Sequence, residues 1–167
     1  MTTDSFDVTS FNATNVDTIW SYKSGKWSAY STNSQTSSKL TANTIATLAT
    51  VKAGEGTWIY AKQPFTITKV GTPYNFLGDN WSGKIGYGWS LVGSGEQTAP
   101  LNLYKKVQNY GGTLNSIWKY NNNKWFVHSE NMFFIEKIKA DALNGTSSVG
   151  GVLDGINAGE GFWIDVR

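Results

Sequence analysis

Hydrophobic and aromatic residues alternate with polar ones along most of this chain, and turn-forming residues recur about every ten positions. Alternation with a period of two places successive side chains on opposite faces of a strand, so the pattern predicts mostly antiparallel β-structure. Residues 19–22 and 27–31 read as two strands around a four-residue connection, 23–26, whose glycine suits a positive φ. Later in the chain, asparagines at 121–123 tolerate the same backbone.

Two pairs of similar segments occur in the same order. IWSYKSGKW at residues 19–27 returns as IWKYNNNKW at 117–125, and AGEGTWI at 53–59 returns as AGEGFWI at 158–164. The first pair is 98 residues apart (117 minus 19) and the second is 105 apart (158 minus 53). Preserved order at nearly constant spacing indicates an internal duplication.

The expected architecture is all-β, with two pseudo-repeats of antiparallel strands forming a sandwich or barrel-like module. We expect the first repeat at residues 1–95 and the second at 96–167, with the GWSLVG strand at 88–93 belonging to either half. The first repeat lacks an upstream GWSLVG, unless YNFLG at 74–78 is a decayed relative of that strand. Apolar residues at helical spacing, followed by an Asn-Gly pair, predict one short helix near 132–143.

Comparison of the two copies indicates which face of the first repeated strand is polar. The position between Trp and Tyr is Ser21 in one copy and Lys119 in the other. We therefore expect this face to contact water. The aromatic residues on the opposite face are then expected to form core: Trp20, Tyr22, Trp118 and Tyr120.

The second repeated strand carries Trp58 and Tyr60 on one face, and their counterparts are Trp163 and Asp165. Because a carboxylate is seldom left unpaired in a core, this face is expected to be at least partly exposed. The isoleucine between each pair then points inward.

An indole ring at the surface is costly to leave in water, and stacking on the apolar face of a sugar is one use for it. The alternative is that a loop or the other copy covers these rings. The candidate ligand-binding residues are the aromatic side chains expected at the surface and the polar groups near them: Trp58, Trp163, Trp81, Tyr87, Tyr60, Asp165, Glu55 and Glu160.

Glu55 and Glu160 occupy equivalent positions in the two AGEG turns. The favoured interpretation is structural, with each carboxylate accepting hydrogen bonds from turn amides. The alternatives are a contact with a sugar hydroxyl or calcium, or an acid–base pair for glycoside hydrolysis. Such a pair requires the two copies to face each other across a pseudo-twofold axis.

Composition narrows the function further. Charged residues make up 16% of the chain and the formal net charge is +2, which argues against nucleic acid as a partner. With no cysteine and one histidine, we expect no enzymatic activity and no cofactor; a structural calcium ion is the alternative left open. No apolar run approaches the roughly 20 residues that cross a bilayer, so no membrane insertion is expected.

Three elements occur in order in residues 86–167: GWSLVG, then IWKY with its hairpin and NKW, then AGEGFWI. This order resembles an uncharacterised bacterial repeat of secreted and cell-surface proteins, of the form GW(N/S)LVG, IWxYxxxKW and AG(K/E)G(Y/F)W. The resemblance implies an extracellular or cell-surface β-module within a larger protein and assigns no activity. Glutamate replaces the usual lysine of the turn in both copies, so no role of that lysine is carried over.

The expected function is non-catalytic binding or adhesion. A polysaccharide or glycan is the preferred partner, because 14% of residues are aromatic and lie among neutral Ser, Thr and Asn. The alternative is a structural or protein-interaction domain, such as a surface-layer, virion or spacer module, whose aromatic residues bury against a neighbouring protein chain.

Overall fold

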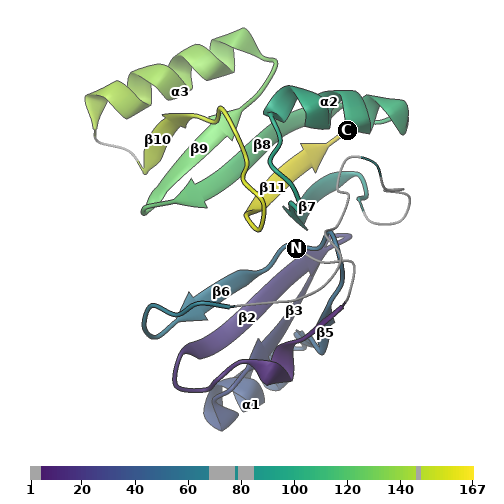
Figure 1. Ribbon diagram of the computed structural model, residues 1–167, viewed down its shortest axis with the longest axis vertical. Coiled ribbons are helices and arrows are strands. Elements are labelled where there is room, and N and C mark those ends of the chain that lie inside the picture. Colours follow the sequence, from purple (N-terminus) through teal and green to yellow (C-terminus); the bar gives the residue numbers. More distant parts are fainter. Residues whose placement is uncertain (1–4, 68–77, 79–84, 146–147) are drawn as a thin grey trace.

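The structure is a computed structural model that describes residues 5–67, 78, 85–145 and 148–167 (Figure 1). These residues form a five-stranded, a four-stranded and a two-stranded sheet, together with three α-helices and one 3-10 helix. The chain is therefore mostly β. The expected all-β class with a single short helix was too narrow, because two further helices are present.

The four-stranded sheet has the order β4-β3-β2-β6. Its strands are β2 (Val16–Lys23), β3 (Lys26–Ser31), β4 (Ala46–Thr47) and β6 (Trp58–Ala61). β2 pairs antiparallel with β3 and β6, whereas β3 pairs parallel with β4. A parallel pair needs a crossover, and α1 (Ser34–Ala42) lies in that connection. The two-stranded sheet joins β1 (Phe6–Asp7), which leads into the 3-10 helix Val8–Ser10, to β5 (Thr50–Val51).

The five-stranded sheet has the order β10-β9-β8-β11-β7 and lies in the upper part of Figure 1. Its strands are β7 (Gly88–Gly93), β8 (Leu114–Asn121), β9 (Lys124–His128), β10 (Val149–Val152) and β11 (Gly161–Val166). α2 (Pro100–Asn109) connects β7 to β8, and α3 (Met132–Asn144) crosses between the parallel strands β9 and β10. The helix expected near 132–143 is thus present, and Gly145 ends it with a φ of 66°.

The two large sheets share a pattern of strand pairing. In one, Ile19 pairs with Ile59 and Trp20 with Trp58; in the other, Ile117 pairs with Ile164 and Trp118 with Trp163. Both hairpins turn through two residues with positive φ, Ser24–Gly25 and Asn122–Asn123, so the expected four-residue connection is two residues shorter.

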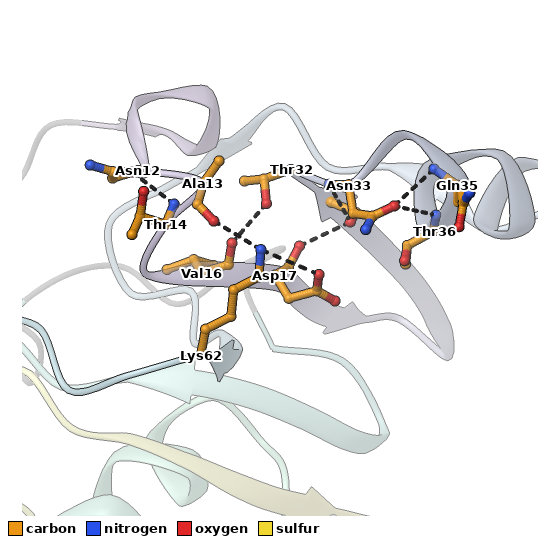
Figure 2. Close-up of polar contacts among 11 residues, drawn as sticks. Asn12, Ala13, Thr14, Val16, Asp17, Thr32, Asn33, Gln35, Thr36 and Lys62 are labelled. Carbon is orange, nitrogen blue, oxygen red and sulfur yellow. Dashed lines mark hydrogen bonds and ion pairs between the residues drawn. The ribbon is translucent and has the colours of Figure 1, made fainter.

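The start of α1 shows how the crossover helices are fixed. The Asn33 side chain accepts hydrogen bonds from the amides of Gln35 and Thr36 at 2.9 and 3.2 Å (Figure 2). Asn131 accepts one from the amide of Phe134 at 3.2 Å in α3. These are N-caps, which satisfy amides that the first turn of a helix leaves unpaired.

A buried serine lies just before each cap. The hydroxyl of Ser31 donates to the carbonyl of Asp17 at 2.9 Å, and that of Ser129 donates to the carbonyl of Asn115 at 2.7 Å. Each serine thereby connects the end of one strand to the start of its hairpin partner. Near the Ser31 contact, Lys62 Nζ donates to the Ala13 carbonyl at 2.9 Å (Figure 2).

The hydrophobic cores lie on the faces that carry the repeated isoleucines. Ile117, Ile164 and Phe162 pack with Leu103 and Tyr104 of α2. The core of the other sheet is built from residues of β2, the N-terminal segment and the segment before β5: Val8, Val16, Ile19 and Leu48. Each large sheet therefore buries one face beneath its own chain segments.

The face assignment of the first repeated strand was wrong. Ser21 and Lys119 are only 6% and 9% exposed, because they share a face with the core isoleucines. Ser21 donates to the carbonyl of Gly56 at 3.4 Å, and Lys119 forms an ion pair with Glu160. The residues expected in the core are instead partly exposed (Trp20, Tyr22 and Trp118) or exposed (Tyr120).

A short backbone seam joins the two large sheets. Gly56 N donates to the Leu91 carbonyl at 3.1 Å, and Gly93 N donates to the Gly54 carbonyl at 3.0 Å. The strand β7 thus bonds β11 on one edge and residues 54–56 on the other. A Cβ on Gly56 would lie 2.5 Å from the Val92 carbonyl oxygen, so only glycine fits this approach.

Candidate functional site

The faces opposite the cores bring the motif tryptophans of the two sheets together around a cavity of about 570 Å³, which we call the aromatic cleft. This volume is typical of small-molecule sites. Among the described residues, one tyrosine and six tryptophans line the cleft: Tyr22, Trp27, Trp58, Trp89, Trp118, Trp125 and Trp163. Both sheets therefore contribute to one site.

The tryptophan rings touch one another in a continuous series. Ring centroids are separated by 5.9 Å for Trp58–Trp125, 6.2 Å for Trp125–Trp118, 6.4 Å for Trp118–Trp89, 6.4 Å for Trp89–Trp163 and 5.7 Å for Trp163–Trp27. Most of these contacts are edge to face, an arrangement that aromatic pairs favour. The series fixes the walls of the cleft, since each indole restrains the next.

The contacts across the cleft are reciprocal. Trp58 packs against the second hairpin, with its ring centroid 5.2 Å from that of Tyr120. Trp163 packs against the first hairpin, with its centroid 5.4 Å from that of Tyr22. The other half of the chain thus covers part of each ring, yet Trp58 remains 37% exposed.

Strand pairing explains why the hairpin rings reach the cleft. Tyr22 lies directly opposite Trp27, and Tyr120 directly opposite Trp125. Directly paired residues point to the same face of a sheet. Each tight turn therefore presents a Tyr-Trp pair at the tip of its hairpin.

The described lining of the cleft is aromatic throughout and includes no Asp, Glu, Lys, Arg or His side chain. The indole Nε1 of Trp118 donates to Ser116 Oγ at 3.0 Å. A neighbouring cavity of about 310 Å³ includes Thr57 and Gly161 in its lining and has a more mixed surface. Polar contacts to a ligand are thus available beside the rings.

Among the aromatic residues proposed from the sequence, Trp58 and Trp163 line the cleft. Tyr60 and Tyr87 are exposed but do not line it. Trp81 lies outside the described residues. Five rings that line the cleft were not proposed as ligand-binding from the sequence: Tyr22, Trp27, Trp89, Trp118 and Trp125. Strand pairing within the two hairpins was the signal that could have identified four of them. Only Trp89 lies outside the two hairpins.

Asp165 differs from the exposed position expected for it. Its side chain is buried and accepts a hydrogen bond from Asn115 Nδ2 at 2.7 Å, with Arg167 Nε at 3.8 Å. The carboxylate is tolerated there because these neighbours satisfy it. The aspartate therefore does not mark an exposed face.

Both turn glutamates bind their own turns, as the favoured interpretation held. Glu55 accepts a hydrogen bond from the Lys52 amide at 3.0 Å and pairs with Lys23 at 2.9 Å. Glu160 makes the equivalent contact with the amide of Asn157 at 2.7 Å and pairs with Lys119 at 2.9 Å.

The environment of Glu160 also changes its titration. Burial raises the pKa of Glu160, but the hydrogen bonds from Lys119 and Asn157 and the positive charge of Lys119 outweigh burial. The pKa therefore lies below its ordinary value. Glu160 stays ionised as an anchor of the turn.

Within the described residues, no group of three or more His, Asp or Glu side chains is placed to hold a metal ion. In the same part of the chain, no helix is long and apolar enough to cross a membrane. Comparisons with family models, curated proteins and solved structures find no match.

Proposed function

We propose that this protein is a non-catalytic binding module that holds a neutral carbohydrate in the aromatic cleft. The observation that carries the proposal is the continuous series of tryptophan rings around one open cavity. Sugars have apolar faces that stack on aromatic rings and hydroxyl groups that need polar partners at the edge. The cleft supplies the first, and the mixed cavity beside it supplies the second.

The charge of the site supports a neutral ligand. Proteins that bind single-stranded nucleic acid combine aromatic platforms with a positively charged groove. Among the described residues, no lysine or arginine lines the cleft, so these residues offer no positive charge to phosphate groups. The low net charge of +2 points the same way.

The turn glutamates support binding without catalysis. Each carboxylate already accepts a backbone amide and pairs with a lysine. A general acid in glycoside hydrolysis needs a raised pKa, whereas the pKa of Glu160 is lowered. These contacts fit an anchoring role.

We further infer that the chain contains two copies of one β-unit and serves as a module of a larger secreted or surface protein. The matched strand pairings, hairpin turns and helix caps support the duplication. The motif order and its resemblance to a surface repeat support the location.

Tryptophan fluorescence tests the binding proposal. Because six tryptophans of the described residues line the cleft, a bound ligand should change the emission strongly. The protein is titrated with a panel of neutral polysaccharides, alongside Trp58→Ala and Trp163→Ala. We expect one glycan to shift the emission and both variants to weaken its binding at least about tenfold, as loss of a stacking contact implies. Tyr110→Ala, at the C-cap of α2, is the control that should bind normally.

The rival role is a structural or protein-interaction domain. It predicts no response to any glycan, together with concentration-dependent self-association or binding of an aromatic-groove ligand such as a proline-rich peptide. Either of these results without a glycan response would overturn the carbohydrate proposal. Circular dichroism of each variant separates a lost contact from a lost fold.

A further inference from the structure

We propose that the aromatic cleft binds an internal stretch of an extended, unbranched polysaccharide, with Tyr60 contacting a sugar unit beyond one end of the cleft. This inference rests on the proposed carbohydrate function and specifies the form of its ligand. It follows from how the two sheets overlap and from the exposure of the rings along the cleft.

Each large sheet presents three rows of residues on the face that lines the cleft, where a row is a set of residues paired side by side on neighbouring strands. In the first half the rows, starting at the hairpin tip, are Tyr22 with Trp27, then Trp20 with Trp58, then Thr18 with Tyr60. In the second half they are Tyr120 with Trp125, then Trp118 with Trp163, then Ser116 with Asp165 and Trp89. Both sets follow directly from strand register.

The two sets of rows overlap in opposite directions, so the middle row of each sheet contacts the hairpin tip of the other. Trp58, in the middle row of the first half, contacts Trp125 at the tip of the second. Trp163, in the middle row of the second half, contacts Trp27 at the tip of the first. The third rows therefore extend beyond the overlap in opposite directions, with Tyr60 past one end and Trp89 at the other.

The exposure of the rings indicates that neither end is closed. Trp58 and Trp89, in rows near opposite ends of the overlap, are 37% and 42% exposed, and Trp27, in a row between them, is 40% exposed. A pocket for a terminal sugar would bury the ring at its blind end. Trp118, Trp125 and Trp163 are only partly exposed. Exposed rings toward both ends instead fit a passage through which a chain continues on both sides.

The aromatic rings recur along the strand that carries Trp58. Neighbouring centroids in the series lie 5.7–6.4 Å apart. Tyr60 continues the series, because it follows Trp58 by two residues on the same strand face, a step of roughly 7 Å. Tyr60 is 62% exposed and so offers a free ring face to the next unit.

The test compares oligosaccharides of increasing length with end-blocked ones. Cello-, xylo-, manno- and chito-oligosaccharides, from the monosaccharide upward, are titrated by tryptophan fluorescence and calorimetry. The longest member of the binding series is then tested with bulky groups on both termini. We expect affinity to rise with length by about five- to tenfold for each additional ring engaged, and the blocked oligosaccharide to bind as well as the free one.

Tyr60→Ala should weaken binding of the longest oligosaccharide about five- to tenfold and leave the shortest ligand unaffected. Tyr110→Ala, which removes another exposed tyrosine, should change neither. Loss of binding on end-blocking, affinity independent of length, or no effect of Tyr60→Ala would overturn internal-chain recognition while leaving carbohydrate binding intact. No binding of any glycan would instead overturn the proposed function, and this inference with it.

Discussion

Trp58 stacks on Trp125 from the opposite sheet, with ring centroids 5.9 Å apart and an interplanar angle of 28°. The pair joins the last strand of one half to the hairpin of the other. Trp163 and Trp27 make the reciprocal contact at 5.7 Å. The rings that form the proposed binding surface therefore also connect the two sheets, so the stability of the molecule and the shape of its cleft depend on the same contacts.

Replacing Trp58 with alanine should lower the free energy of unfolding by about 1–3 kcal/mol. Truncating a fully buried aromatic costs about 3–5 kcal/mol, and the smaller value reflects the partial exposure of this ring. Urea denaturation measures the change. Trp58→Phe should recover most of it, since a ring remains to face Trp125. Equal losses in the two variants would contradict a stacking role.

The backbone seam between the sheets is short, but disrupting it should lower the stability of the protein strongly. Gly56→Ala places a methyl group 2.5 Å from the Val92 carbonyl oxygen, so the seam must separate. We expect a loss of more than about 2 kcal/mol in urea denaturation. Gly155→Ala is the matched control, because no atom lies within 4 Å of its added Cβ; its effect should stay within about 1 kcal/mol.

Local signals predicted several elements correctly. The Asn-Gly pair after an apolar stretch identified α3, and the turn residues identified both hairpins. α1 was missed because SQTSSKLTA has no buried residue and hence no apolar face to detect. α2 does carry such a signal, since Leu103, Tyr104 and Val107 have helical spacing. The parallel pairings that α1 and α3 connect leave no mark in strand alternation.

The faces of the strands were harder to predict than the strands themselves. The polarity of Lys119 predicts exposure to water. Lys119 is instead buried and forms an ion pair with Glu160, which lies 41 residues further along the chain. A long-range ion pair of this kind is invisible in local sequence. The aromatic cleft also depends on long-range contacts, because it forms only where the aromatic faces of the two sheets meet. The sequence of either half alone therefore does not predict it.

The two turn glutamates should differ in their effect on stability. Glu160→Gln keeps an acceptor for the turn amide but leaves the Lys119 ammonium largely buried without its counter-charge, and should cost about 1–3 kcal/mol. Glu55→Gln should cost less than about 1 kcal/mol, because its partner Lys23 is much more exposed. Parallel urea denaturation of both variants at neutral pH measures the difference.

The effect of Glu160 should also depend on pH. Its folded-state pKa lies below the ordinary value of 4.5, so ionised Glu160 stabilises the fold above that value. This stabilisation is lost as the pH falls from 4.5 through the lowered pKa. The stability difference between the wild type and Glu160→Gln should therefore shrink over that acidic interval. A difference that stays constant down to strong acid would contradict the ion-pair interpretation.

The two helix caps provide a test of which crossover helix supports the cleft. α1 has no buried residue, whereas α3 buries Ile138 and places Phe134 with its ring centroid 6.0 Å from that of Trp118. Asn131→Ala should therefore cost about 1 kcal/mol of global stability and change tryptophan emission. Asn33→Ala should mainly allow α1 to fray, seen as faster amide hydrogen exchange at Gln35 and Thr36 with little change in emission. Equal effects of the two variants on emission would show that α1 supports the cleft as much as α3, because the caps themselves are alike.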